Sequence, residues 1–217
     1  AAQTISGTLS ANLAAGETVY VSLDNGGTWT AATASVGTNT WSLAGQTLTG
    51  SNTLKVKVSD AAGNDGVAFS QAYTLDTTAP TTASVLTLAN DTGSSNTDNI
   101  TTDGTINVTG LEAGATWEYK IKSGAWTTGA GSSFVLPVAS YAVGDIQVRQ
   151  TDVAGNVQTT GLGSNATAIT VNAAPTTTIA TAAFSADTGT SSSDFITKTA
   201  AQTISGTLSA NLAAGET

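Results

Sequence analysis

AAQTISGTLSANLAAGET, residues Ala1–Thr18, returns letter for letter at Ala200–Thr217. The two copies start 199 residues apart. Chance does not produce a repeat of this length, and internal repetition is the strongest sequence indication of a repeat architecture. We therefore expect the chain to be a window from a tandem array rather than a self-contained enzyme.

A second, weaker repeat divides each period into two modules. The loop motif Asp91-Thr-Gly…Asp98-Asn-Ile-Thr returns as Asp187-Thr-Gly…Asp194-Phe-Ile-Thr. Each half has about 100 residues, an ordinary size for a small domain. We expect three segments: module A over residues 1–76 without its first strand, a complete module B over 77–172, and the start of the next module A over 173–217.

Alternation of apolar and polar residues predicts strands throughout. Val19, Val21 and Leu23 alternate with polar residues, as do Leu54, Val56 and Val58, which is the pattern of a strand with one wet face. Short strands separated by frequent turn residues are typical of a β-sandwich. In module B the pattern predicts strands near residues 84–89, 105–109, 117–122, 133–136, 145–150 and 168–171.

Composition excludes several classes of function. The chain has no Cys, His or Met, so it lacks a disulfide framework, Ser-His or Cys-His catalytic pairs and most zinc sites. A metal would be held by oxygen ligands, which favours calcium or magnesium. The net charge of −9 argues against nucleic-acid binding. No apolar run approaches the roughly 20 residues of a membrane span, so no membrane insertion is expected.

Four short motifs, which recur across the whole chain, resemble bacterial immunoglobulin-like extender repeats of giant type I-secreted (RTX-type) adhesins. They are the linker Asp76–Pro80, the Asp-Thr-Gly…Asp…Ile-Thr loop, the segment Ile5–Val19 and the loop Asp60–Asn64. The resemblance implies tandem immunoglobulin-like β-sandwich modules, end to end, with one module split across the two ends of the chain. It also implies an extracellular rod at the bacterial cell surface, rigidified by structural Ca²⁺ at module junctions. Such a rod projects an adhesive tip for surface attachment or biofilm formation.

The aspartates of the repeated loops are the candidate calcium ligands. Stacking sandwich modules end to end brings the first inter-strand loop of one module, the linker and the last inter-strand loop of the next module together. The candidates in these segments are Asp60, Asp76, Asp91, Asp98, Asp152, Asp187 and Asp194. For each of them an ordinary turn role remains the alternative. Asp65 and Asp103 are weaker candidates, and Asp24 and Asp145 are expected to be turn residues.

Two further functions stay open beside the extender. A sandwich without its first strand exposes an edge, so the tail of one copy could complete the head of the next in a head-to-tail filament. Alternatively, Trp29 and Trp126 could form part of a carbohydrate- or surface-binding module, although Trp117 is expected in the core. No catalytic residue is predicted. The expected partners are neighbouring modules of the same protein.

Overall fold

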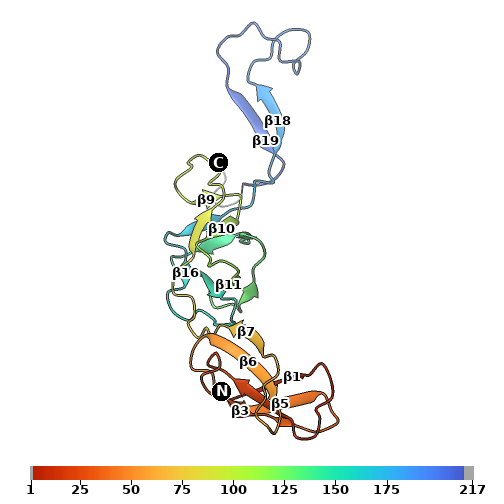
Figure 1. Cartoon of the computed structure of the whole chain (residues 1–217). Coiled ribbons are helices and arrows are strands. Elements are labelled where there is room, and N and C mark those ends of the chain that lie inside the picture. The colour runs from red at the N-terminus through yellow and green to blue at the C-terminus, as the bar shows by residue number, and fades with distance from the viewer. Residues whose placement is uncertain (1, 213–217) are drawn as a thin grey trace. The chain divides into compact units, whose positions relative to one another are not determined.

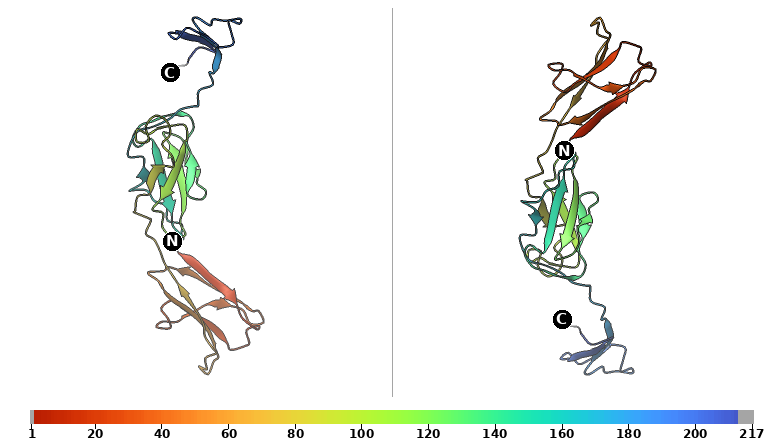
Figure 2. Two further views of the ribbon diagram at one scale, coloured as in Figure 1. Left: turned by 90° about the horizontal axis from the view of Figure 1, so that it is seen from above. Right: turned by 90° about the horizontal axis from the view of Figure 1, so that it is seen from below.

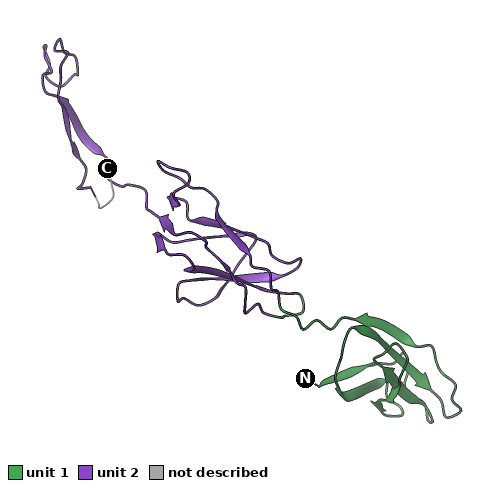
Figure 3. Cartoon of the chain, turned by 90° about the vertical axis from the view of Figure 1, so that its left-hand side faces the viewer, with its two compact units in different colours: residues 1–79, 153–156 green, residues 80–152, 157–217 purple. Residues whose placement is uncertain are grey.

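A computed structural model of the chain describes residues 2–212, which form an all-β protein (Figure 1). The described residues contain 19 strands and no helix. The chain divides into two compact units, coloured in Figure 3. Unit 1 comprises residues 1–79 with 153–156, and unit 2 comprises 80–152 with 157–217. Residue 79, where the first stretch of unit 1 ends, lies three residues from the predicted end of module A at residue 76. The division into three segments remains a prediction.

Unit 1 is built from two antiparallel sheets. One sheet has the strand order β1-β5-β4, and the other has the order β3-β2-β6-β7. The strands are β1 (Gln3–Thr8), β2 (Thr18–Ser22), β3 (Thr30–Ala31), β4 (Thr33–Ala34), β5 (Thr40–Gln46), β6 (Asn52–Ser59) and β7 (Phe69–Tyr73).

The core of unit 1 lies between these two sheets. Val19 and Val21 of β2 are at most 2% exposed, as the alternation of this strand predicts. Val56 of β6 and Trp41 of β5 pack in the same cluster. Because residues of both sheets share one core, unit 1 has the layering of a β-sandwich.

Unit 2 contains three sheets and a separate hairpin (Figure 2). The sheet orders are β13-β10-β8, β12-β11-β15-β16 and β14-β17-β9. The strands are β8 (Val85–Leu88), β9 (Ile100–Thr101), β10 (Thr105–Thr109), β11 (Thr116–Ile121), β12 (Thr127–Thr128), β13 (Ser133–Val135), β14 (Ala139–Tyr141), β15 (Ile146–Thr151), β16 (Gly163–Ser164) and β17 (Ile169–Val171). The hairpin pairs β18 (Ile179–Phe184) with β19 (Ile204–Leu208).

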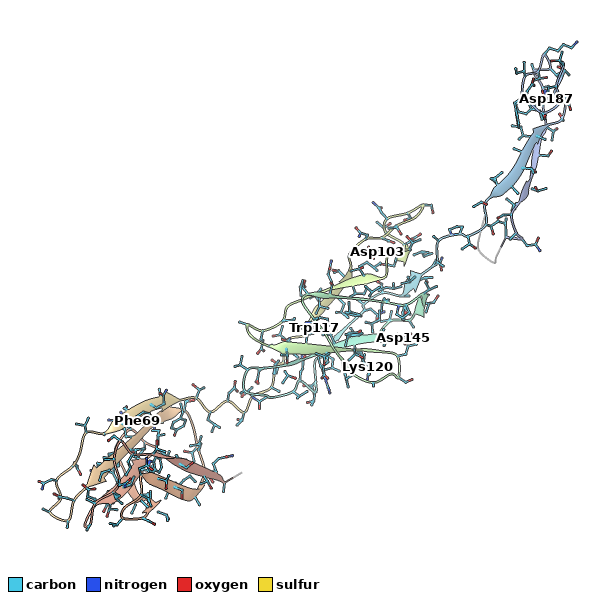
Figure 4. All side chains as sticks on the ribbon, turned by 90° about the vertical axis from the view of Figure 1, so that its right-hand side faces the viewer. Phe69, Asp103, Trp117, Lys120, Asp145 and Asp187 are labelled. Atoms are coloured by element: carbon cyan, nitrogen blue, oxygen red, sulfur yellow. The ribbon has the colours of Figure 1, made fainter. Side chains whose placement is uncertain are left out.

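Trp117 lies at the centre of the unit 2 core (Figure 4). Its side chain is 5% exposed, and its indole Nε1 donates a hydrogen bond to the Gly131 carbonyl at 3.0 Å. Residue 129 has to be glycine, because a Cβ there would lie 2.3 Å from the Trp117 ring. The prediction that Trp117 is a core residue is confirmed.

Three buried amide side chains tie the loops of unit 2 to its sheets. Gln150 Oε1 accepts the backbone N–H of Glu112, and Gln158 Oε1 accepts that of Gln150. Asn165, 2% exposed, accepts the backbone N–H of Ile146 and donates to two carbonyls. A buried amide with all these partners costs little to bury and holds its loop in one place.

All six strands predicted for module B are present, with ends that differ by no more than two residues. The two-residue strands β9, β12 and β16 and the three-residue β14 were not predicted. They are too short to show an alternating pattern. The all-β, sandwich-type expectation is confirmed.

The repeated sequence occupies two different pairings. In its first copy, β1 has β5 as its one strand partner among the described residues and lies at the edge of its sheet. In its second copy, the residues equivalent to 5–9 form β19, and within residues 2–212 this strand pairs only with β18. In unit 2, the strand that follows an Asp-Thr-Gly loop in the same way is β10, which pairs with both β8 and β13. Each copy of the repeat therefore has one of the two partners that β10 has.

Candidate functional site

The two Asp-Thr-Gly loops have the same internal structure. Asp91 Oδ2 accepts the backbone N–H of Asn99 at 2.9 Å, and Asp187 Oδ2 accepts that of Phe195 at 3.1 Å. Asn99 and Phe195 both have a φ of 58°. The two loops differ in sequence between the motif residues, yet they orient the first aspartate in the same way. The loop conformation is therefore a property of the Asp-Thr-Gly…Asp…Ile-Thr motif.

In both loops one oxygen of the first aspartate has no partner. Oδ1 of Asp91 and Oδ1 of Asp187 are buried, and neither has a hydrogen-bond partner among the described residues. Asp187 lies in the loop that joins β18 to β19 (Figure 4). A buried carboxylate oxygen without a donor is unfavourable, so its occurrence at both equivalent positions indicates a place suited to a cation.

The second aspartate of each loop serves a turn. Asp98 Oδ1 accepts the backbone N–H of Ile100, and Asp194 Oδ1 accepts that of Ile196, each at 3.0 Å. Both side chains are exposed, and nothing in these bonds occupies the other carboxylate oxygen. Asp98 and Asp194 thus each stabilise a turn through Oδ1 and leave Oδ2 outside these turn bonds.

The remaining candidates lie in the linker and in the Asp…Gly-Asn loops. Asp60 is exposed and binds both the backbone and the side chain of Asn64, which lowers the pKa of its carboxyl group. Asp76 Oδ1 accepts the backbone N–H of Thr78, and the Asp76 carbonyl accepts a bond from Asn156 Nδ2 at 3.2 Å. Asp152 is half-buried and also engaged with neighbouring groups.

The seven predicted aspartates do not gather into one cluster. Over residues 2–212, no three acidic side chains come together in a way that could hold a metal. Each Asp-Thr-Gly loop supplies two carboxylates, and calcium needs 6–8 oxygen ligands. A loop of this kind fits calcium as part of a site, with carbonyl and water oxygens completing it.

Asp24, expected to be a turn residue, and Asp65 and Asp103, the weaker calcium candidates, all accept hydrogen bonds from neighbouring groups. Asp24 accepts hydrogen bonds from the Ser22 hydroxyl and from both the backbone and the hydroxyl of Thr28. The Ser22 bond makes the largest contribution in lowering the Asp24 pKa to about 2. Hydrogen bonds from Asn90 and Thr105 lower the pKa of Asp103, and Lys57 lowers that of Asp65.

These depressed pKa values predict acid sensitivity. A carboxyl group whose pKa is lower in the folded state stabilises the fold above its unfolded pKa of about 4, and this stabilisation is lost as pH falls through the folded pKa. We expect a constant melting temperature from neutral pH to about pH 5, then a decrease toward pH 2. Asp24→Asn should show a smaller acid-induced decrease than the unsubstituted chain. Melting curves that coincide at all these pH values would contradict the prediction.

Trp29 and Trp126 are covered by cations. Lys57 Nζ lies 4.5 Å from the Trp29 ring centroid. Over Trp126, Lys120 Nζ lies at 5.0 Å and the Arg149 guanidinium carbon at 4.3 Å. The two tryptophans therefore share a role as cation–π partners.

A groove of 710 Å³ opens in unit 1. Its lining includes Gly7 and Leu9 on one side, Trp41 and Val56 of the core, and Phe69 of β7. Phe69, marked in Figure 4, is 59% exposed although it is a large apolar side chain. The sequence predicted an open edge in this module but not a groove that reaches its core.

The chain matches no family model, and no curated protein is significantly similar to it. Within residues 2–212, no helix is long and apolar enough to cross a membrane.

Proposed function

We propose that this chain is a structural extender: a segment of a tandem array of immunoglobulin-like β-sandwich modules in a bacterial cell-surface adhesin. Its function would be length and stiffness, holding an adhesive tip away from the cell for attachment or biofilm formation. The chain itself would carry out no catalysis.

One observation carries this proposal. The 18-residue repeat falls on a strand, and its second copy pairs with β18 in the way that β10 pairs with β8. Thr181↔Thr207, Ala182↔Gly206 and Ala183↔Ser205 reproduce the pairs formed by Val85, Leu86 and Thr87 with β10. This pairing supports the proposal that the segment from residue 173 begins another module, as an array of like modules requires.

Calcium would stiffen this array through the Asp-Thr-Gly loops. Asp91 and Asp187 would each offer the buried oxygen that lacks a hydrogen-bond donor, and Asp98 and Asp194 would each offer an exposed carboxylate. Asp76, Asp152 and Asp60 are the further ligands proposed for the linker and the neighbouring loops. The cation would neutralise these carboxylates and order the loops.

Thermal unfolding in millimolar calcium and in EDTA tests the calcium role. A ligand that binds only the folded form at 100–1,000 times its Kd stabilises it by roughly 3–4 kcal/mol. We expect calcium, but not magnesium, to raise the melting temperature by about 10 °C or more.

Asp91→Asn supplies the matched variant, because asparagine keeps the acceptor for Asn99 N–H and removes the charge. It should lose part of the calcium response, while Asp145→Asn should keep it. Equal melting temperatures in calcium and EDTA would remove calcium from the proposal and leave the loops as ordinary turns.

A further inference from the structure

The three basic residues between positions 77 and 172 lie on two paired strands or next to them, although this segment has seven acidic residues. Lys120 of β11, labelled in Figure 4, alternates with residues that pack against the core, and Arg149 of β15 alternates with buried residues. Both side chains therefore stand on the outer face of the β12-β11-β15-β16 sheet. Lys122 directly follows β11 and is exposed.

Trp126 brings two of these cations together. Lys120 Nζ lies 5.0 Å from the centroid of its ring, and the Arg149 guanidinium carbon lies 4.3 Å from it. Arg149 also forms an ion pair with Glu118 at 2.7 Å. Because these contacts hold the charged groups near one position, a ligand that binds there loses less side-chain freedom than it would on mobile lysines.

The charge on this surface is positive, in contrast to the chain as a whole. We call Glu118, Lys120, Lys122, Trp126 and Arg149 the cationic face. Glu118 is the one acidic residue on the four strands of the sheet, so three cations stand against a single carboxylate. Among the described residues, neither Lys120 nor Lys122 forms an ion pair. In a chain of net charge −9, this surface is suited to an anion.

The corresponding surface of unit 1 is neutralised. There Lys57 lies over Trp29, and Asp65 pairs with Lys57 at 2.6 Å. The contact between a cation and a tryptophan is thus common to both units, whereas cations without a carboxylate beside the tryptophan contact are a feature of unit 2.

We propose that the cationic face binds a polysaccharide that carries carboxylates, such as a polymer of uronic acids. Lys120 and Lys122 would pair with carboxylates of the sugar units. Trp126 is half-buried, and its accessible part would contact the apolar C–H groups of a sugar ring, as aromatic side chains in ligand sites do. A neutral polysaccharide would leave the two lysines without partners.

The density of charge favours a polyuronate over a nucleic acid. Duplex DNA carries one negative charge per about 1.7 Å of its axis, and the seven acidic residues of the same segment would repel it. A polyuronate carries a single carboxylate on each sugar. A few cations can therefore neutralise the part of the polymer that they contact, while the acidic residues elsewhere meet much weaker repulsion.

Removing two lysines tests where the polymer binds. Isothermal titration with polygalacturonate measures the affinity at low ionic strength, and dextran is the uncharged control polymer. Lys120→Gln/Lys122→Gln should weaken binding about tenfold. Lys55→Gln/Lys198→Gln changes the net charge by the same amount at two lysines outside the cationic face and should change the affinity by less than about twofold. Circular dichroism verifies that both variants fold.

Removing the acid should have the opposite effect. Glu118→Gln takes away the carboxylate that pairs with Arg149 and should strengthen binding about threefold. Glu112→Gln, at an exposed position outside the cationic face, makes the same change in net charge and should have little effect. A gain in affinity cannot come from a chain that fails to fold, so this pair excludes a merely structural role of the face.

Four results would overturn the proposal: no saturable binding of polygalacturonate, equal binding of dextran, equal weakening by the two double variants, or no gain with Glu118→Gln. Tighter binding of single-stranded DNA would also overturn it and assign the face to nucleic acid. All titrations contain EDTA, because calcium would cross-link the polymer. Binding at this face depends on neither the array nor calcium, so its failure would leave the calcium-dependent melting shift untouched.

Discussion

Replacing Trp117 with alanine is expected to lower the free energy of unfolding of unit 2 by about 3–5 kcal/mol. The side chain is 5% exposed and contacts Phe134 and Tyr119 in the central cluster of the core. Its removal leaves a cavity that the surrounding strands cannot fill, and frees the Gly131 carbonyl from its bond to Nε1. The loss is a large share of the about 5–15 kcal/mol that stabilises a typical domain.

Native-state hydrogen exchange measures this effect unit by unit. Amides of β11 and β15 should lose protection, while those of β2 and β6 should keep it. Val138→Ala, a substitution at a site 62% exposed in the same unit, is the control and should change little. A parallel loss of protection in both units would show that the units do not unfold independently.

Replacing Asn165 with leucine is expected to destabilise unit 2 by about 3 kcal/mol, despite the similar size of the two side chains. Asn165 serves three backbone groups, those of Ile146, Ala142 and Thr167. Leucine can replace none of these bonds, so buried polar groups are left unpaired. Denaturant unfolding followed by circular dichroism gives the change.

The exposed Asn96 provides the control, since Asn96→Leu removes an amide that the sheets do not use. If Asn165→Leu were as stable as the original chain, water would have to satisfy the three groups. The buried amides would then contribute little to holding the loops.

The regular strands could be predicted because their periodicity reports burial directly. Val19 and Val21 alternate with polar residues, and both are buried. The same rule extended to β15 places Gln150 on the face of Ile146 and Val148, and Gln150 is indeed fully buried. Its polarity concealed this signal, since a strand pattern is normally traced by apolar residues alone.

Burial of the repeated segment could not be predicted from its own residues. Leu13 and Leu212 have identical neighbours in sequence but are 4% and 49% exposed. The difference lies in which strands are present to cover them, a long-range property that local pattern does not contain. That the groove of unit 1 reaches Trp41 could not be predicted for the same reason.

The candidate calcium loops were partly accessible from sequence. Their recurrence identified Asp91 and Asp187 as equivalent, and their shared backbone bonds agree with that equivalence. Which oxygen each loop leaves without a donor depends on the path of the backbone at Asn99 and Phe195. That path is set by the folded loop rather than by the residue types.

The position of the identical stretch also bears on how the number of periods can change. The repeat includes β1 and β19, so in the proposed array it lies inside a module rather than between modules. In such an array, recombination between two copies of the stretch joins the sequence that precedes one copy to the sequence that follows the other. The preceding sequence contains a strand equivalent to β18, and the following sequence contains the strands that come after β1. The joint falls within a strand that both parents share, so it restores a whole module in frame. If the chain is a segment of the proposed array, periods are gained or lost in this way without creating a new junction, and the length of the array varies while each of its sandwiches stays the same.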